Sequence, residues 1–217
     1  MKTFETLGII GVVATLAACH VDLGGISGSG TMKTEARTVP AFHAVDASGA
    51  LEVTVTVGGA QKVEVTADDN LLTHVKTSVD SGTLRLSTEG ITNPTKTIRV
   101  TVAAPAVDAV SASGATKVDV KGVKGDTFTA NATGADTMTI AGEVGKATLK
   151  ADGASTISAA ALHAKSARLE ADGASTTEGY ATDEVDAAAD GASTVTFAGA
   201  PKSVKKSASG ASTVRAK

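Results

Sequence analysis

A four-residue phrase, Ala-x-Gly-Ala, occurs seven times in this chain of 217 residues, and its last six copies are evenly spaced. Its glycines are Gly49, Gly114, Gly134, Gly153, Gly173, Gly191 and Gly210. From Gly114 onward, successive glycines are separated by 20, 19, 20, 18 and 19 residues. A fixed period of about 19 residues predicts a solenoid, in which each coil packs against its neighbours and one core runs through the stack.

The residues on both sides of each glycine alternate between polar and mostly apolar side chains. Four residues after the glycine, the six later repeats have Val118, Met138, Ile157, Thr177, Val195 and Val214. One position earlier they have Lys117, Thr137, Thr156, Thr176, Thr194 and Thr213. A period of two is typical of a strand and not of a helix. Each repeat therefore supplies two short strands that meet at an Ala-x-Gly-Ala corner.

Stacking such repeats produces parallel strands about 4.8 Å apart, and the fold class that we predict is an all-β parallel β-helix with coils of about 19 residues. Glycine suits a corner that needs a positive φ or a close backbone approach, so we assign the seven glycines a structural role. Aromatic residues make up only 2% of the chain and there is no Trp, which predicts a narrow aliphatic core. The single Cys excludes an intrachain disulfide.

The N-terminus has the organisation of a bacterial lipoprotein signal. Residues 7–18 form an apolar run that is too short to span a bilayer but suits a signal peptide. The run ends Leu-Ala-Ala-Cys, which resembles a lipobox whose cysteine is diacylated after cleavage. We therefore expect a signal peptide over residues 1–18, a lipid on Cys19, and a glycine-rich flexible tether over residues 19–35. His20 follows the cysteine where an Asp would favour inner-membrane retention, so the expected location is the outer membrane.

The first half of the chain lacks the clean period. It reads as strands over residues 51–57, 62–67, 75–79, 83–87 and 96–103, separated by turn residues. Four segments then occur in order, and they begin at Arg37, Val63, Val79 and Ile98: RTVPAFHAVDASG, VEVTADDNLL, VDSGTLRL and IRVTVAAP. Together with the glycine corners, this order resembles the head GIN domain family of bacterial envelope proteins, which are labelled auto-transporter adhesins. The resemblance covers residues 36–217, of which residues 110–217 hold the regular repeats.

The resemblance implies a right-handed parallel β-helix on a secreted or lipid-anchored protein. It brings no catalytic residue with it. The chain has Asp-Gly-Ala-Ser corners where Ser-Gly-Ser-Gly corners are common in the family. The expected function is that of a non-catalytic envelope lipoprotein, either an adhesin or a scaffold that presents a rigid surface. The first alternative is a periplasm-facing structural or stress-related lipoprotein without an external ligand.

Three aspartates, Asp152, Asp172 and Asp190, precede successive glycines and are expected to form a ladder. Stacked carboxylates repel one another unless solvent or a cation separates them, which makes the ladder a candidate calcium site. The competing interpretation is that each Asp accepts a backbone hydrogen bond at its own corner. Thr133 and Ser209 occupy the same column and favour this second interpretation, and the Gly-Gly-x-Gly-x-Asp calcium motif is absent.

A second column places hydroxyl groups on one outward strand face, as in Thr137-Met-Thr139 and Thr194-Val-Thr196. A flat ladder of this kind resembles the surface of ice-binding solenoids. Glu178 and Arg215 interrupt it, and exposed Thr is a favourable strand residue in any case.

The remaining residues argue against catalysis and against nucleic acid. His20, His43, His74 and His163 are scattered without metal-ligand spacing, and Tyr180 with four Phe offers few rings to stack on sugars. A polysaccharide-processing enzyme is accordingly the remote alternative, and we expect no cofactor. A net charge of −3 does not indicate nucleic acid. The expected partners are the membrane, through the lipid, and a surface glycan or other envelope polymer, with the C-terminal lysines either capping the last coil or binding an anionic polymer.

Overall fold

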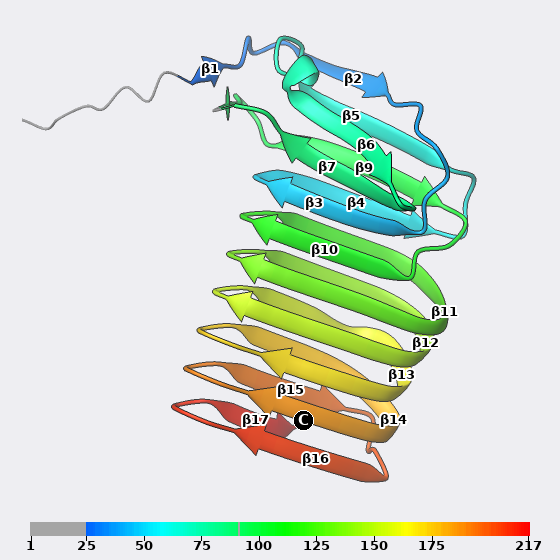
Figure 1. Ribbon diagram of the computed structural model, residues 1–217, viewed down its shortest axis with the longest axis vertical. Helices are drawn as coiled ribbons and strands as arrows, with labels where there is room; N and C mark the ends of the chain where they lie inside the picture. The colour runs from blue at the N-terminus through cyan, green and yellow to red at the C-terminus, as the bar shows by residue number, and fades with distance from the viewer. Residues whose placement is uncertain (1–24, 91) are drawn as a thin grey trace, which may run out of the picture.

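The computed structural model describes residues 25–90 and 92–217, which form a nearly all-β solenoid of about five turns (Figure 1). Within these ranges the helical structure is limited to one 3-10 turn, η1 (Leu72–His74). No helix in this part of the chain has the length and apolar character needed to cross a membrane. The predicted signal peptide and Cys19 lie outside the described residues.

The regular half consists of strands that stack in parallel and in register. They are β10 (Ala109–Gly114), β11 (Lys117–Gly134), β12 (Thr137–Gly153), β13 (Thr156–Ala171), β14 (Thr176–Ala189), β15 (Thr194–Ala198), β16 (Ser203–Ala208) and β17 (Thr213–Ala216). Gly114 pairs with Gly134 and Gly134 with Gly153, while Val118 pairs with Met138 and Met138 with Ile157. The register confirms the stacked parallel β-helix and the glycine corners.

Each coil has two flat sides and two corners. The glycine corners follow one another along the edge where the arrowheads of β3 and β10 end in Figure 1. At the opposite edge β11, β12 and β13 bend without ending, and register shifts fall there, between Val120 and Val123 and between Ser158 and His163. This second corner varies in length from coil to coil, because the repeats themselves vary from 18 to 20 residues.

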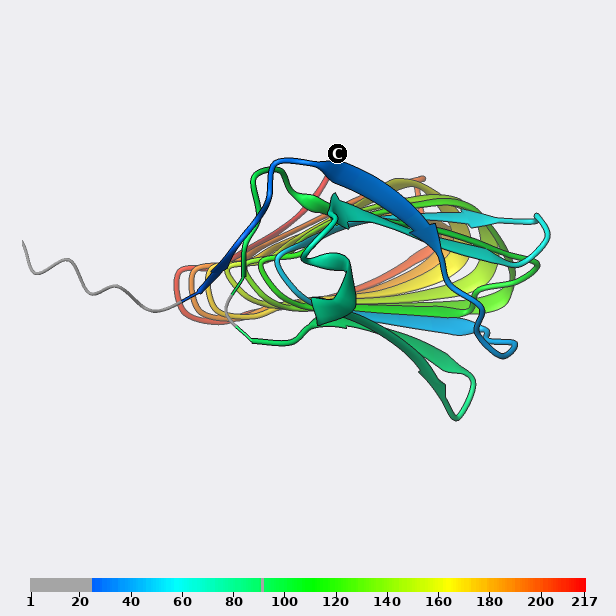
Figure 2. The ribbon, with the colours of Figure 1, turned by 90° about the horizontal axis from the view of Figure 1, so that it is seen from above.

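The irregular first half forms the first coil and covers one end of the stack. Its strands are β3 (Ala44–Gly49), β4 (Leu51–Val57), β5 (Lys62–Asp68), β6 (Val75–Asp80), β7 (Thr83–Thr88) and β9 (Ile98–Ala104). All of them except β3 agree with the five strands predicted from the sequence. β3 and β4 pair in parallel with β10 and β11, and β7 and β9 pair in parallel with β3 and β4. Outside these strands the pairing becomes antiparallel, β6 on β7 and β5 on β9. Figure 2 shows β2 (Met32–Ala36) and η1 lying across this end of the stack.

Part of the segment predicted to be a flexible tether belongs to the folded domain. Residues 26–36 belong to the folded domain as β1 (Ile26–Ser27) and β2 (Met32–Ala36). β1 pairs with β8 (Thr92–Asn93), and β2 pairs antiparallel with β5 from Met32 and Asp68 to Ala36 and Glu64. The glycines that suggested a tether instead let the backbone pass close to Asp68: a Cβ on Gly28 would lie 2.4 Å from a carboxylate oxygen of Asp68.

Asp68 holds three segments of this end together. Its side chain is fully buried, and its carboxylate accepts hydrogen bonds from the Gly30 N–H (2.8 Å), the Thr95 N–H (2.9 Å) and the Thr95 hydroxyl (2.6 Å). The hydrogen bond from the Thr95 hydroxyl lowers the pKa of Asp68, and the two N–H groups act in the same direction. Burial acts in the opposite direction, but the pKa stays below its usual value. The ionised form is therefore the one that stabilises the fold.

We expect the contribution of Asp68 to stability to be lost in acid. Because its folded pKa lies below the unfolded value of about 3.9, the contribution is present above that pH and disappears as the pH falls through the folded pKa. The midpoint of urea unfolding of Asp68→Asn should lie well below that of the wild type at pH 7, and the two should converge in acid. A difference between the two urea midpoints that stays constant from pH 7 to pH 2 would contradict a stabilising role for the ionised Asp68 carboxylate.

The core between the two sides is narrow and aliphatic, as the composition predicts. The alanine before each corner is buried in every coil but the last, as in Ala132, Ala151 and Ala171, where a larger side chain would force the sides apart. Leu149 and Leu169 are both buried, and Leu169 approaches Gly179 of the next coil, where a Cβ would lie 2.6 Å from its terminal methyl. The largest completely buried side chain is that of Phe128.

A ladder of buried polar residues lies inside the glycine corners and was not expected from the sequence. It consists of Thr116, Asp136, Ser155, Ser175 and Ser193. Ser175 and Ser193 donate to the carbonyl oxygens of Ala151 (3.0 Å) and Ala171 (2.7 Å). Asp136 accepts from the Thr116 N–H at 2.7 Å, yet its burial raises its pKa. The neutral carboxyl group of Asp136 therefore stabilises the fold at low pH, and this contribution is lost as the pH rises through its folded pKa. Asp68 shows the reverse, because its contribution is lost as the pH falls.

Candidate functional site

The three aspartates of the predicted ladder lie on successive glycine corners, at the outer surface of the stack. Oδ1 of Asp152 accepts from the Gly153 N–H, and Oδ1 of Asp190 accepts from the Gly191 N–H, both at 2.6 Å. The Ser209 hydroxyl also donates to Asp190 at 2.6 Å, and these two bonds lower the pKa of Asp190. Asp172 instead lies 4.0 Å from the Lys150 ammonium. The carboxylates are therefore occupied locally and do not converge on one point.

Residues 25–90 and 92–217 contain no group of three or more His, Cys, Asp or Glu side chains that could hold a metal ion. We accordingly expect the thermal midpoint of the purified chain to be the same in millimolar calcium and in EDTA. A cation that bound only the folded state would raise the midpoint with its concentration. A calcium-dependent rise that Asp172→Asn abolishes would restore the ladder as a metal site.

The outward strand face carries the predicted rows of hydroxyl groups. Thr137, Thr156, Thr176, Thr194 and Thr213 stand in register on successive coils. The parallel row contains Thr139, Ser158, Glu178, Thr196 and Arg215. Glu178 forms an ion pair with Lys217, and Thr196 is buried, so this row is neither flat nor uniformly hydroxylated. The face is a regular polar strand surface with a charged break in it.

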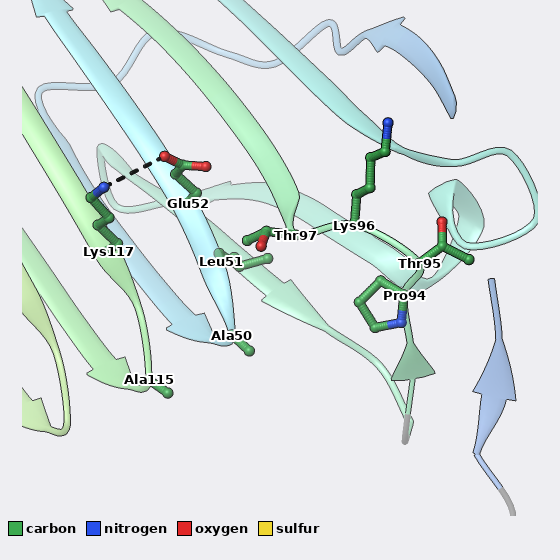
Figure 3. A pocket seen from close by; sticks show the side chains of 9 residues that line it. All are labelled: Ala50, Leu51, Glu52, Pro94, Thr95, Lys96, Thr97, Ala115 and Lys117. Carbon is green, nitrogen blue, oxygen red and sulfur yellow. Dashed lines mark ion pairs between the residues drawn. The ribbon is translucent and has the colours of Figure 1, made fainter. Parts of the chain in front are cut away.

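A hollow of about 690 Å³ lies where β4, β11 and the segment before β9 meet (Figure 3). Glu52 lies on its wall, 2.9 Å from the Arg99 guanidinium and 3.8 Å from the Lys117 ammonium. The hydrogen bond from Arg99 lowers the pKa of Glu52, and the charges of Arg99 and Lys117 act in the same direction. Glu52 is therefore matched by these two cations, and Thr95 holds the buried Asp68, so both of these lining residues serve the fold.

The structure separates two of the histidines and brings a third next to the only tyrosine. His43 Nδ1 lies 3.1 Å from the Asp108 carboxylate on the exposed surface, and His74 belongs to η1. His163 packs against Tyr180 with ring centroids 4.5 Å apart, while His20 lies outside the described residues. His163 and Tyr180 are 17 residues apart, which is close to the length of one coil, so their spacing in the sequence indicates that they could be neighbours. It was not decisive, because the register shifts at the second corner.

The last coil ends the stack with charge. Lys206 pairs with Ala187 in the column that holds Leu149 and Leu169 in earlier coils. Its ammonium lies 5.0 Å from the centroid of the Phe197 ring, which would otherwise face the open end. All six residues of β16 are exposed. The lysines therefore cover the end of the core, as expected of a capping coil.

A family model and several solved structures are similar to this chain. A family profile described as putative auto-transporter adhesin, head GIN domain, matches residues 41–201. The fold is similar to that of a putative adhesin from Bacteroides fragilis, with 22% identity, a TM-score of 0.74, and coverage of 89% of this chain and 100% of that one. It is also similar to a putative adhesin from Parabacteroides merdae, with 18% identity, a TM-score of 0.58, and coverage of 89% and 99%. No curated protein matches the sequence.

Proposed function

Because the chain belongs to the head GIN domain family, we propose that it acts as a non-catalytic adhesin on the bacterial envelope. The observation that carries this proposal is the architecture itself. The stack presents long, regular and polar outer faces, and the carboxylate that lines its hollow of about 690 Å³ is paired with Arg99 and Lys117. Such a surface suits contact with an extended partner better than capture of a small substrate.

The absence of catalysis is part of the proposal. General acid–base or nucleophilic chemistry needs a nucleophile within hydrogen-bond reach of a base. Across the part of the chain that the structure describes, His43 has only Asp108 as its hydrogen-bonding side chain, and His163 has an aromatic neighbour. Neither histidine forms a hydrogen bond to a Ser or Thr hydroxyl in these ranges.

The membrane attachment is the second part of the proposal. A diacylated Cys19 would hold the chain at the outer membrane, and the folded domain begins with β1 only seven residues later. The domain would then stand close to the lipid surface, with the capped N-terminal end of the solenoid nearer the membrane than the last coil. Cys19→Ala is expected to move the chain from the membrane fraction to the soluble fraction.

The experiment that tests the adhesin function compares three strains in one attachment assay. They produce the full chain, the Cys19→Ala chain, or no chain, and each is allowed to settle on glass and on a layer of sister cells. Attachment should fall in the last two strains and return when the wild-type gene is supplied. Equal attachment of all three strains to both surfaces would refute the proposal.

A further inference from the structure

The second corner of the coils forms a groove that differs from the rest of the surface. Two adjoining hollows of about 410 Å³ and about 290 Å³ share Glu143, Val144 and Lys165, and so form one continuous depression. We call it the corner groove. Its polar and aromatic lining consists of Lys124, Asp126, Glu143, His163, Lys165 and Tyr180.

The backbone register creates the groove. Lys124 pairs with Glu143, Glu143 with His163, and His163 with Tyr180, so these four side chains form one row on successive coils. Neighbouring members of the row are about 4.8 Å apart. Beside the row, the backbone at Gly145 packs closely against the preceding coil, since a Cβ there would lie 2.7 Å from the Asp126 carbonyl oxygen. The buried Val144 lies in the lining that the two hollows share.

The polar groups of the corner groove are free to bind. Within the described ranges, Lys124, Asp126, Glu143 and Lys165 form no ion pair within 4.0 Å, and neither the Tyr180 hydroxyl nor the His163 ring forms a hydrogen bond. Two other lysines nearby do form ion pairs, Lys121 with Asp119 and Lys202 with Asp183, both at 2.8 Å.

The composition of the groove decides the class of ligand. Two ammonium groups and two carboxylates cancel, so the groove attracts neither a polyanion nor a polycation. The His163–Tyr180 pair offers a half-exposed aromatic surface at one end of the row. A pyranose ring places C–H groups on an aromatic face and hydroxyls at its edge, and these hydroxyls both donate to carboxylates and accept from ammonium groups. One sugar residue of an extended glycan also advances by roughly one coil spacing.

We infer that the corner groove binds an uncharged, extended glycan, with one sugar stacked on Tyr180, whose ring is held by His163, and the next sugars bonded to Glu143 and Lys165. This inference rests on the proposed function and names the ligand through which the adhesin attaches. It gives the single tyrosine of the chain a role in binding.

The chain contains one Tyr and no Trp, so intrinsic fluorescence reports on the corner groove alone. Full-length chain in detergent is titrated with maltohexaose and with chitotetraose, and polygalacturonate serves as the acidic comparison. A saturable change in tyrosine emission with at least one of the neutral oligosaccharides is expected. No change with either, or a response to polygalacturonate alone, would overturn the inference.

Titration calorimetry of variants then locates the binding site, because its signal does not depend on tyrosine fluorescence. Tyr180→Ala should weaken binding of the responding oligosaccharide about tenfold or more, and Tyr180→Phe should weaken it less because the ring remains. His43→Ala, an exposed histidine at the other end of the stack, should bind like the wild type. Wild-type affinity in a Tyr180→Ala chain whose circular dichroism is unchanged would place the ligand elsewhere.

The attachment assay separates this inference from the proposed function. Cells that produce Tyr180→Ala should attach as poorly as cells without the chain. If they attach like the wild type, the adhesin function stands and the corner groove is overturned as its binding site.

Discussion

Replacing Gly173 by Ala is expected to destabilise the chain by about 2–5 kcal/mol, although it adds one methyl group to an exposed corner. Gly173 has a φ of +76°, which disfavours any residue with a Cβ, and a Cβ there would lie 2.7 Å from the carbonyl oxygen of Gly153 in the coil before. The methyl group would have to push two coils apart along their whole corner. Urea unfolding followed by circular dichroism measures the loss.

Gly90 is a matched control for this substitution. Its φ is +77°, but a Cβ on Gly90 would meet nothing within 4 Å. Gly90→Ala should therefore cost only the backbone term of about 1–2 kcal/mol. The difference between the two variants measures the close approach of stacked corners. Equal losses for Gly173→Ala and Gly90→Ala would mean that the corners do not stack as described.

The second large effect concerns Leu169, which is completely buried and approaches Gly179 of the next coil. Leu169→Ala should cost about 2–5 kcal/mol, because the coils on either side cannot collapse into the space. Val204, which is 41% exposed in the last coil, provides the comparison: Val204→Ala should change the free energy of unfolding by less than about 0.5 kcal/mol.

Gly179 on the facing side makes room for Leu169, and the pair can be tested together. A Cβ on Gly179 would lie 2.6 Å from a terminal methyl of Leu169. Gly179→Ala should therefore destabilise the wild type by about 1–3 kcal/mol but cost less in the Leu169→Ala background. A coupling of about 0.5–3 kcal/mol is expected from such direct contact. Strict additivity of the two substitutions would contradict this packing.

The sequence predicted the regular half well because its period and its polar alternation agree at every coil. The columns of Gly114, Val118 and Leu149 fall in register in the structure as the alignment on glycine places them. The end of the stack was less predictable. The glycine-rich stretch before β2 resembles a tether by composition, and only the buried Asp68 carboxylate shows why it is ordered.

The candidate sites also differ in how far the sequence predicts them. The aspartate column could be read from the sequence, because it adjoins the glycines that define the repeat. The corner groove could not, because the repeats differ in length at the second corner and register shifts separate Ser158 from His163. The contact between His163 and Tyr180 depends on those shifts. The buried Ser and Thr ladder was also missed, since a short polar residue beside a glycine is typical of an exposed turn.

An adhesin must present its solenoid to the outside of the cell. The most direct test inserts the recognition sequence of a site-specific protease between Gly58 and Gly59, in the exposed turn between β4 and β5, where an insertion disturbs no packing. Protease added to intact cells should cut the full-length chain while a periplasmic marker stays protected. If the chain is cut only after the outer membrane is broken, the domain faces the periplasm, and the structural lipoprotein without an external ligand becomes the correct description.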